Sequence, residues 1–202
     1  MSNTSSSNRR LPAQTVVLDR DGTLVVDRNY LDDPDDLEFL PGAAEGLRRL
    51  HERGYRLVVI SNQSGVGRGR FSLERLREIN ARLQQMVRAA GAELAGIYCC
   101  PHRPEDGCAC RKPGTELLLQ AARELRFDPE ASIVIGDKAT DIELGRRVGA
   151  RTMLISSASD GSHEGPPAAD HVVPDLSAAA RLIEALQTEA VAAAAVRSDG
   201  MA

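Results

Sequence analysis

Two acidic residues near the N-terminus have a spacing that suits chemistry. The segment "VVLDRDGTLVVD" (16–27) places Asp19 and Asp21 directly after an apolar run. Side chains two positions apart in a strand point the same way, so both carboxylates would lie on one face beside buried residues. Like charges in such a place are costly unless a cation neutralises them. The spacing therefore favours a site that holds a cation, although two aspartates could also simply cap a turn.

A pair of carboxylates of this kind suits phosphoryl transfer. One ionised carboxylate can attack phosphorus and form an aspartyl-phosphate. The second can protonate the leaving oxygen and later take a proton from the hydrolytic water. Gly22 suits a tight turn that brings backbone N–H groups close to a phosphate. Mg²⁺ would neutralise the carboxylates and bind a phosphoryl oxygen.

Short β-rich runs alternate with longer helical patterns along the chain, which predicts an α/β fold with a mostly parallel sheet flanked by helices. We expect strands at 15–18, 55–61, 94–100, 131–137 and 150–156, with a short sixth strand possible at 171–173. Helices are expected at 43–54, 72–91, 115–126, 140–149 and 176–196. Sheets of this class bind ligands beyond the carboxyl ends of their strands.

Polar residues follow several of these expected strands. Asp19 and Asp21 follow the first strand, Ser61 and Asn62 end the second, and Asp137 ends the fourth. The carboxyl ends of parallel strands meet at one edge of a sheet, so this edge can collect all of these side chains. The sequence therefore predicts a site at this edge.

The segment "CCPHRPEDGCACRKP" (99–113) holds all four cysteines. A common ligand composition of structural zinc sites is matched by Cys100, His102, Cys108 and Cys110. Four protein ligands leave no open position, so we expect a structural zinc ion, with free thiols in a loop as the alternative. Cys99 is expected to face away from Cys100 and into the core. A zinc-bound loop would fix Lys112 and direct Arg111 into the cleft, unless Arg111 is a plain surface cation.

Length and composition limit the protein class. The chain has 202 residues and a net charge of −4, so it fits one domain and carries no general basic signal for nucleic acid or anionic membranes. No segment is long and apolar enough to cross a bilayer, and "MSNTSSSNRRLPAQ" lacks a secretory apolar region. We expect a disordered leader (1–13), a single domain (14–188) and a flexible tail (189–202). A cytoplasmic monomer with a small-molecule substrate follows as the default.

Four motifs, "LDRDGTL", "ISNQSG", "CRKP" and "IGDKATDI", resemble in order those of the haloacid dehalogenase (HAD) superfamily of phosphatases, over roughly residues 15–175. The resemblance implies a Rossmann-like HAD fold with Asp19 as the nucleophile and Asp21 as the general acid/base. It implies that Ser61 and Lys112 hold the phosphoryl oxygens. It also implies a catalytic Mg²⁺ held by Asp19, the backbone carbonyl of Asp21, and Asp137.

Two residues near the metal side keep open roles. Lys138 and Asp141 could orient Lys112, the metal or the substrate, and Asp141 could equally be an ordinary carboxylate in a first helical turn. Larger members of the superfamily carry an inserted cap domain. Neither 24–55 nor 62–111 has room for one, so we expect an open cleft shaped by loops.

Within the superfamily, the chain is similar to the phosphatases of heptose 1,7-bisphosphate and of histidinol phosphate, both of which carry the zinc loop. The segments "VVDRNYL", "NQSGVGRGRFS", "GIYCCPH" and "GDK" favour the heptose family and loss of the C7 phosphate. The five-residue gap between His102 and Cys108 fits either family. The implied substrate contacts are Asp27, Arg28, Asn29, Tyr30, Ser61, Asn62, Gln63, Ser64, Arg111, Lys112 and Lys138.

Some alternatives stay open. Arg68 and Arg70 could meet the distal phosphate or could form a solvated basic turn. Histidinol phosphate, or a broader range of small phosphomonoesters, is the second choice of substrate. A non-catalytic, zinc-stabilised binding module is disfavoured because every motif residue is present, and a nucleic-acid 3′-phosphatase is disfavoured by the acidic balance and the scarcity of aromatics.

Overall fold

The computed structural model describes residues 14–156 and 169–199, with side chains described as far as residue 189. Six parallel strands form one sheet in the order β3-β2-β1-β4-β5-β6. The strands are β1 (Thr15–Leu18), β2 (Arg56–Asn62), β3 (Leu94–Cys100), β4 (Ile133–Gly136), β5 (Arg151–Ile155) and β6 (His171–Val173). The order is that of a Rossmann-like sheet, which confirms the predicted fold class.

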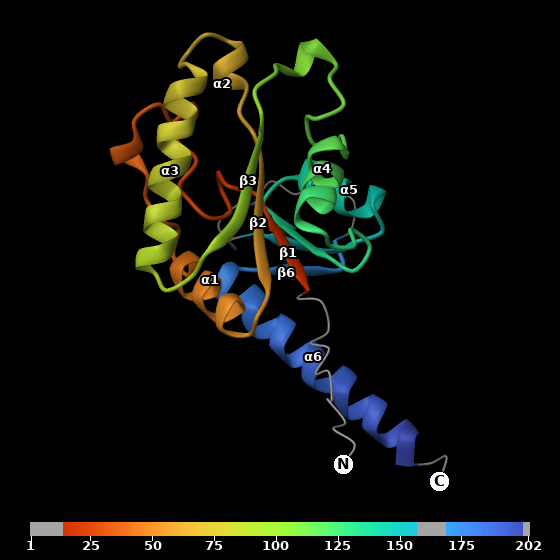
Figure 1. Cartoon of the computed structure of the whole chain (residues 1–202). Coiled ribbons are helices and arrows are strands. Elements are labelled where there is room, and N and C mark those ends of the chain that lie inside the picture. Colours follow the sequence, from red (N-terminus) through yellow and green to blue (C-terminus); the bar gives the residue numbers. More distant parts are fainter. Residues whose placement is uncertain (1–13, 157–168, 200–202) are drawn as a thin grey trace, which may run out of the picture.

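Helices connect the successive strands from β1 to β5, and α6 follows β6 (Figure 1). They are α1 (Ala43–Glu52), α2 (Ser64–Gly67), α3 (Leu73–Ala89), α4 (Glu116–Leu125), α5 (Ala139–Arg147) and α6 (Leu176–Asp199), with 3₁₀ turns η1 (Pro34–Asp36) and η2 (Pro104–Asp106). The sixth strand and the five longer helices agree with the expectation to within a few residues. The short helix α2 and both 3₁₀ turns were not expected. Neither 24–55 nor 62–111, both fully described, contains an inserted domain.

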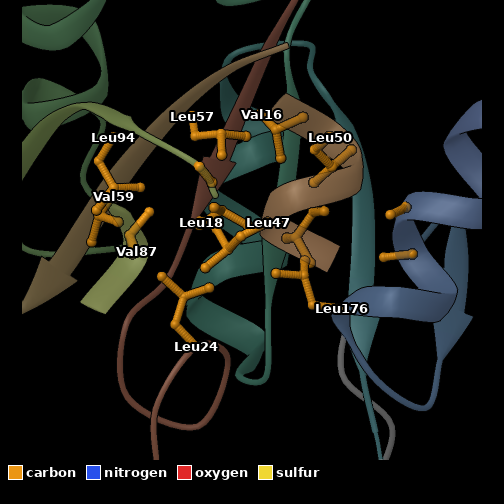
Figure 2. Close-up of a cluster of buried hydrophobic side chains, with 14 of the residues drawn as sticks. Val16, Leu18, Leu24, Leu47, Leu50, Leu57, Val59, Val87, Leu94 and Leu176 are labelled. Carbon is orange, nitrogen blue, oxygen red and sulfur yellow. The ribbon is translucent and has the colours of Figure 1, made fainter. Parts of the chain in front are cut away.

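Both faces of the sheet are buried, which explains why its strands read as continuous apolar runs. Val16 and Leu18 of β1 point into a core that contains residues of α1, α3 and α6, whereas Val17 points into a second core with residues of α4 and α5. Figure 2 shows the first core, with Leu47 and Leu50 of α1 packed over the strands. This two-sided packing fixes the register of β1 and therefore the position of the residues that follow it.

A tight turn after β1 brings the next segment against the end of β4. Gly22 has a φ of +89°, a conformation that side chains with a Cβ rarely adopt. A Cβ at this position would lie 2.2 Å from Oδ2 of Asp137. Gly22 is therefore required both by its backbone conformation and by the close approach of Asp137, the residue that follows β4.

The predicted division of the chain is only partly visible. The expected leader (1–13) lies outside the described residues, and the expected boundary at 188 falls within α6, which continues to Asp199 and runs away from the sheet in Figure 1. Among the helices that the structure describes, none combines the length and the apolar character needed to span a membrane.

Candidate active site

A cavity of about 790 Å³ opens at the carboxyl ends of the strands. β1, β2 and β4 deliver Asp19, Ser61 and Lys138 to it, and the loop after the cysteine segment delivers Lys112. This volume suits a small molecule. Most of the implied substrate contacts line this cavity, namely Asp27, Asn29, Tyr30, Ser61, Asn62, Gln63, Ser64, Arg111, Lys112 and Lys138.

Lys112 lies buried between two carboxylates. Its Nζ forms an ion pair with Oδ1 of Asp19, lies 2.7 Å from Oδ1 of Asp141, and donates to the carbonyl of Ile60 at 2.7 Å. Burial alone would lower the pKa of Lys112, but the two carboxylates outweigh it and raise the pKa. Burial raises the pKa of Asp19, an effect that Lys112 opposes. Lys112 is therefore the cation that favours the ionised form of Asp19.

Asp21 occupies a different environment two residues further on. Gln63 Nε2 donates to its Oδ2 at 2.7 Å and to Ser61 Oγ at 2.7 Å, while Ser61 Oγ donates to the same Asp21 oxygen at 3.5 Å. The guanidinium of Arg20 forms an ion pair with Asp21 at 3.0 Å. The two aspartates of the opening motif thus contact separate cations, one Lys112 and the other Arg20.

The carboxylates of Asp19, Asp137 and Asp141 form a group that suits a hard cation. Their ligand oxygens lie within 4.8 Å of one another. Burial, together with Asp19 and Asp141, raises the pKa of Asp137 to about 7. Asp141 is 2% exposed, and its Oδ1 has the Lys112 ammonium as its close partner at 2.7 Å. Three clustered carboxylates, two of them buried, offer the oxygen ligands that Mg²⁺ prefers, so the residues present fit this ion.

Asp141 has two functions that the sequence left as alternatives. Its Oδ2 accepts a hydrogen bond from the backbone N–H of Lys138 at 3.1 Å, which caps the start of α5. Its Oδ1 faces Lys112 and the carboxylate group. Asp141 is therefore both a first-turn carboxylate and a candidate metal ligand. The side chain of Asp21 is not part of this group, and the ligand expected from Asp21 is its backbone carbonyl.

Side-chain contacts at the ends of β2 and α5 hold further cavity residues in place. Asn62 exchanges hydrogen bonds with the backbone of Lys112, accepting from its N–H at 3.0 Å and donating to its carbonyl at 3.2 Å. Lys138 Nζ pairs with Asp27 at 3.0 Å. Burial would raise the pKa of Asp27, but Lys138 and the backbone N–H of Asn29 lower it. Asp27 and Lys138 thus enter the cavity as an ion pair.

Three arginines of the sequence hypothesis do not line the cavity. Arg28 pairs with Glu38 at 2.9 Å, and Arg68 pairs with Glu105 at 3.1 Å. Arg70 lies 5.7 Å from the centroid of the Tyr30 ring. Arg111 does line the cavity, and its guanidinium donates to the carbonyl of His102 at 3.4 Å. Of these four arginines, only Arg111 is thus placed for substrate contact.

The cysteine segment gathers the four predicted zinc ligands. The ligand atoms of Cys100, His102, Cys108 and Cys110 lie within 4.8 Å of one another. The three sulfur atoms are 3.3–3.5 Å apart and all are free thiols. Tetrahedral zinc with bonds of about 2.3 Å would separate its sulfurs by about 3.8 Å, so small movements would admit the ion. The residues present therefore fit a closed Cys₃His zinc site.

Cys99 faces away from Cys100, as expected, but it does not join an apolar core. Cys99 belongs to neither apolar core, and its Sγ accepts a hydrogen bond from Asn80 of α3 at 3.5 Å. The polar contact explains the difference, since Asn80 brings a side-chain amide to this side of β3. Cys100, on the opposite side, is fully buried.

The site contains polar groups that the sequence analysis missed. Arg20 is 1% exposed and contacts Asp21, and Thr23 Oγ1 donates to Asp137 Oδ1 at 3.4 Å. Both residues belong to the "DRDGT" motif, so their position beside the aspartates in the sequence could have indicated a place in the site. Arginine is rarely buried, however, so its type alone predicted a surface position.

Comparisons with known proteins give consistent results. Residues 109–179 match a family model described as HAD-hydrolase-like. The D-glycero-β-D-manno-heptose-1,7-bisphosphate 7-phosphatase of Haemophilus influenzae is 36% identical over 183 residues, which cover 86% of this chain and 98% of that protein. The D-glycero-D-manno-heptose-1,7-bisphosphate 7-phosphatase of Thermosynechococcus vestitus is 36% identical, with 86% of this chain and 96% of that protein covered.

A solved structure supports the same relationship. The D,D-heptose 1,7-bisphosphate phosphatase of B. bronchiseptica, crystallised with magnesium and phosphate, superposes with a TM-score of 0.76 at 30% identity. The superposition covers 87% of this chain and 99% of that one.

Proposed function

Because the chain belongs to the heptose-1,7-bisphosphate 7-phosphatase family of HAD phosphatases, we propose that it hydrolyses the C7 phosphate of D-glycero-D-manno-heptose 1,7-bisphosphate. The products are heptose 1-phosphate and inorganic phosphate, and the reaction passes through an aspartyl-phosphate. One observation carries the proposal. At the end of the central strand β1, Asp19 is ion-paired with Lys112 while Asp21, two residues on, reaches the same cavity with a separate partner.

Asp19 is the proposed nucleophile. Its carboxylate must be ionised to attack phosphorus, and the neighbouring Lys112 ammonium favours that form. Lys112 and Ser61 are proposed to hold the phosphoryl oxygens. Lys112 is bound to Ile60 and Asp141 as well as to Asp19, so its charge is already in place before substrate enters.

Asp21 is the proposed general acid and base. The C7 oxygen leaves as a poorly stabilised alkoxide unless it receives a proton, and Asp21 supplies that proton while the bond to phosphorus breaks. Asp21 then removes a proton from the water that attacks the aspartyl-phosphate. Gln63 and Arg20 hold its carboxylate, whose side chain is 17% exposed, so it can be reached from the cavity.

Two metal ions are proposed. The fit of the carboxylate group supports a catalytic Mg²⁺ held by Asp19, Asp137 and the backbone carbonyl of Asp21, with Asp141 facing the same point. When bound, Mg²⁺ neutralises the carboxylates and withdraws charge from the phosphoryl group. The Cys₃His set supports a structural Zn²⁺ that stiffens the segment leading to Arg111 and Lys112.

The positions of the cations in the cavity suit a substrate with two phosphate groups. Lys112 is buried beside the nucleophile, whereas Lys138 and Arg111 line the cavity with more exposure. The buried cation suits the reacting phosphate, and the two more accessible cations suit the phosphate at C1 or the sugar hydroxyls. Asp27, Asn29 and Tyr30 line the cavity on the segment after β1 and are proposed to contact the sugar. The paired Arg28 would need to leave Glu38 to contribute.

A cytoplasmic location, a monomeric state and the lack of nucleic-acid or membrane partners stay predictions from the sequence. The expected single domain (14–188) is likewise retained as a proposal.

Kinetics with four substrates test the proposed function. Purified protein is assayed with Mg²⁺ on both anomers of heptose 1,7-bisphosphate, on histidinol phosphate and on p-nitrophenyl phosphate. We expect kcat/KM for one heptose anomer to exceed that for histidinol phosphate by at least about 100-fold, the size of discrimination that a few buried polar contacts provide. A higher value with histidinol phosphate would overturn the substrate assignment, and no turnover of any ester would indicate a binding module.

A further inference from the structure

A charged side chain is buried immediately behind the proposed acid/base. The side chain of Arg20 is 1% exposed, and it is among the largest fully buried side chains of the described residues. A buried guanidinium is costly unless its donors are paired. Nε of Arg20 donates to Asp21 Oδ2 at 3.0 Å and Nη2 donates to Oδ1 at 3.1 Å. This fork contacts both oxygens of the carboxylate and so fixes its plane.

The remaining nitrogen of the Arg20 guanidinium, Nη1, bonds a residue from a distant part of the chain. Nη1 donates to Oδ1 of Asn80, on α3, at 3.3 Å. The amide nitrogen of Asn80 donates to Sγ of Cys99, on β3, at 3.5 Å. Both ends of the amide are therefore engaged, and α3 and β3 together fix the guanidinium that holds Asp21.

We infer that Arg20 is a positioning residue for the acid/base step, and that Asn80 positions Arg20 from α3. The inference rests on the proposed function, because it assigns Arg20 a part in the protonation of the leaving oxygen. An aspartate has two rotatable side-chain bonds, and a proton is delivered efficiently only when the carboxyl group is already oriented toward its acceptor. Gln63 alone would fix one oxygen, whereas the Arg20 fork fixes both.

The leaving group offers a readout that a purely structural role would not change. In the first step the bond from Asp19 to phosphorus forms, and the bond from phosphorus to the leaving oxygen breaks with its electron pair on that oxygen. A sugar oxygen needs the proton of Asp21 at this point, whereas p-nitrophenolate is stable without one. Since kcat/KM reports only steps up to formation of the aspartyl-phosphate, it isolates the acid step from the later base step.

Arg20→Gln and Asn80→Ala are the test variants, and Gln84→Ala is the matched control. Gln84 lies one helical turn after Asn80 on α3 and donates to the carbonyl of Leu94 on β3 at 3.0 Å, so it joins the same two elements without touching Arg20. We expect Arg20→Gln to lower kcat/KM by about 100-fold with heptose bisphosphate and by less than about 5-fold with p-nitrophenyl phosphate. Asn80→Ala should show the same imbalance at about 10-fold, and Gln84→Ala should show none.

A double-mutant cycle provides a second readout with the sugar substrate alone. If Arg20 acts through Asp21, then Arg20→Gln should cost little further activity in an Asp21→Asn background. Arg20→Lys, which keeps the charge but loses the fork, should restore part of the activity. If Arg20→Gln does not fold, Asn80→Ala replaces it in both the comparison of the two substrates and the double-mutant cycle with Asp21→Asn.

The outcomes separate this inference from the proposed function. Equal losses with both substrates, or additive losses in the Asp21→Asn background, would overturn the positioning role while leaving the phosphatase intact. A wild-type protein that hydrolyses neither ester would overturn both.

Discussion

Asp19, Lys112 and Asp141 form a buried row of alternating charges beneath the cavity. All three side chains are less than a tenth exposed, so the charges are largely shielded from water. Lys112 therefore neutralises two carboxylates before substrate binds, in addition to its proposed role with the phosphoryl group. Stability and catalysis should therefore both depend on Lys112, whereas a substitution of Asp19 should affect catalysis alone.

Replacing the proposed nucleophile should abolish turnover and leave the fold intact. Asp19→Asn keeps the shape of the side chain but removes the anionic oxygen that attacks phosphorus, so we expect kcat to fall by at least about 1,000-fold. Phosphate release and circular dichroism check the two halves of this prediction. Activity near the wild-type level would remove Asp19 as the nucleophile.

Replacing Lys112 should damage both properties. Lys112→Met leaves Asp19 and Asp141 without their cation, so we expect a loss of about 3–5 kcal/mol in the free energy of unfolding. The loss of a positioned charge should also lower kcat by at least about 100-fold.

Lys138→Met is the matched control for Lys112, because its side chain is 53% exposed and its ion pair with Asp27 is open to solvent. We expect its free energy of unfolding to change by less than about 1 kcal/mol. Urea unfolding measures both variants. Equal stability effects for the two lysines would contradict the interpretation of Lys112 as a buried neutralising charge.

At the scale of elements, the cysteine segment supports the loop that carries Lys112. Cys110 lies two residues before Lys112, and the sulfurs of Cys100 and Cys108 contact it at 3.3 and 3.4 Å. Zinc bound here would tie this loop to Cys100 at the end of β3. Cys100 pairs with Asn62 of β2, which already bonds the Lys112 backbone. The structural metal and the phosphate-binding group are thus linked through the backbone.

Cys110→Ser should reduce bound zinc from about one ion per chain and lower kcat together with the unfolding temperature. Elemental analysis and thermal unfolding measure the two effects. A Cys99→Ser variant is the control. Cys99 lies outside the ligand set, so this variant should keep its bound zinc. Wild-type protein without zinc, after preparation free of chelators, would contradict the site.

The junction of β5 and β6 gives a pH-dependent prediction. Asp170 is exposed and accepts hydrogen bonds from the backbone N–H and the hydroxyl of Thr152, at 2.7 and 3.0 Å. These bonds lower its pKa and outweigh the opposing effect of its slight desolvation. Its folded pKa is below the unfolded value, so its contribution to stability is present above that unfolded value and is lost as the pH falls through the folded one.

We therefore expect Asp170→Asn to cost about 0.5–1 kcal/mol near pH 7. The difference from wild type should shrink as the pH falls from about 5 to 3. Urea unfolding at a series of pH values measures it. A difference that grows on acidification would contradict the sign of the pKa shift.

The elements were largely predictable, because buried parallel strands and amphipathic helices leave clear patterns. α2 was not, since its sequence "SGVG" has no apolar period and glycine disfavours helices; it forms through local bonds such as Arg68 N–H to the Ser64 carbonyl at 3.0 Å. For the site, the order of strands and polar residues predicted that these side chains gather at one edge of the sheet. Which cation pairs with Asp19 and which with Asp21 was not, because that depends on side-chain orientations brought together by the fold.

For the whole molecule, the sheet order accounts for the place of the site. β1 is central, and the chain continues to β2 on one side while β4 lies on the other. Ligand sites of open parallel sheets lie where the order reverses, and Asp19 and Asp137 follow the two strands that flank this point. The described loops leave the cavity open without an inserted domain, so we expect selectivity to depend on loop residues such as Tyr30, Arg111 and Lys138.

Loss of the C7 phosphate is the central claim, and ³¹P nuclear magnetic resonance of the reaction with heptose 1,7-bisphosphate tests it most directly. The two phosphates give separate signals, since one is a glycosyl ester and the other a primary alkyl ester. We expect the C7 signal to disappear as inorganic phosphate grows, while the C1 signal persists as heptose 1-phosphate. Loss of the C1 signal first, or persistence of both signals with active metal-loaded protein, would contradict the proposed function.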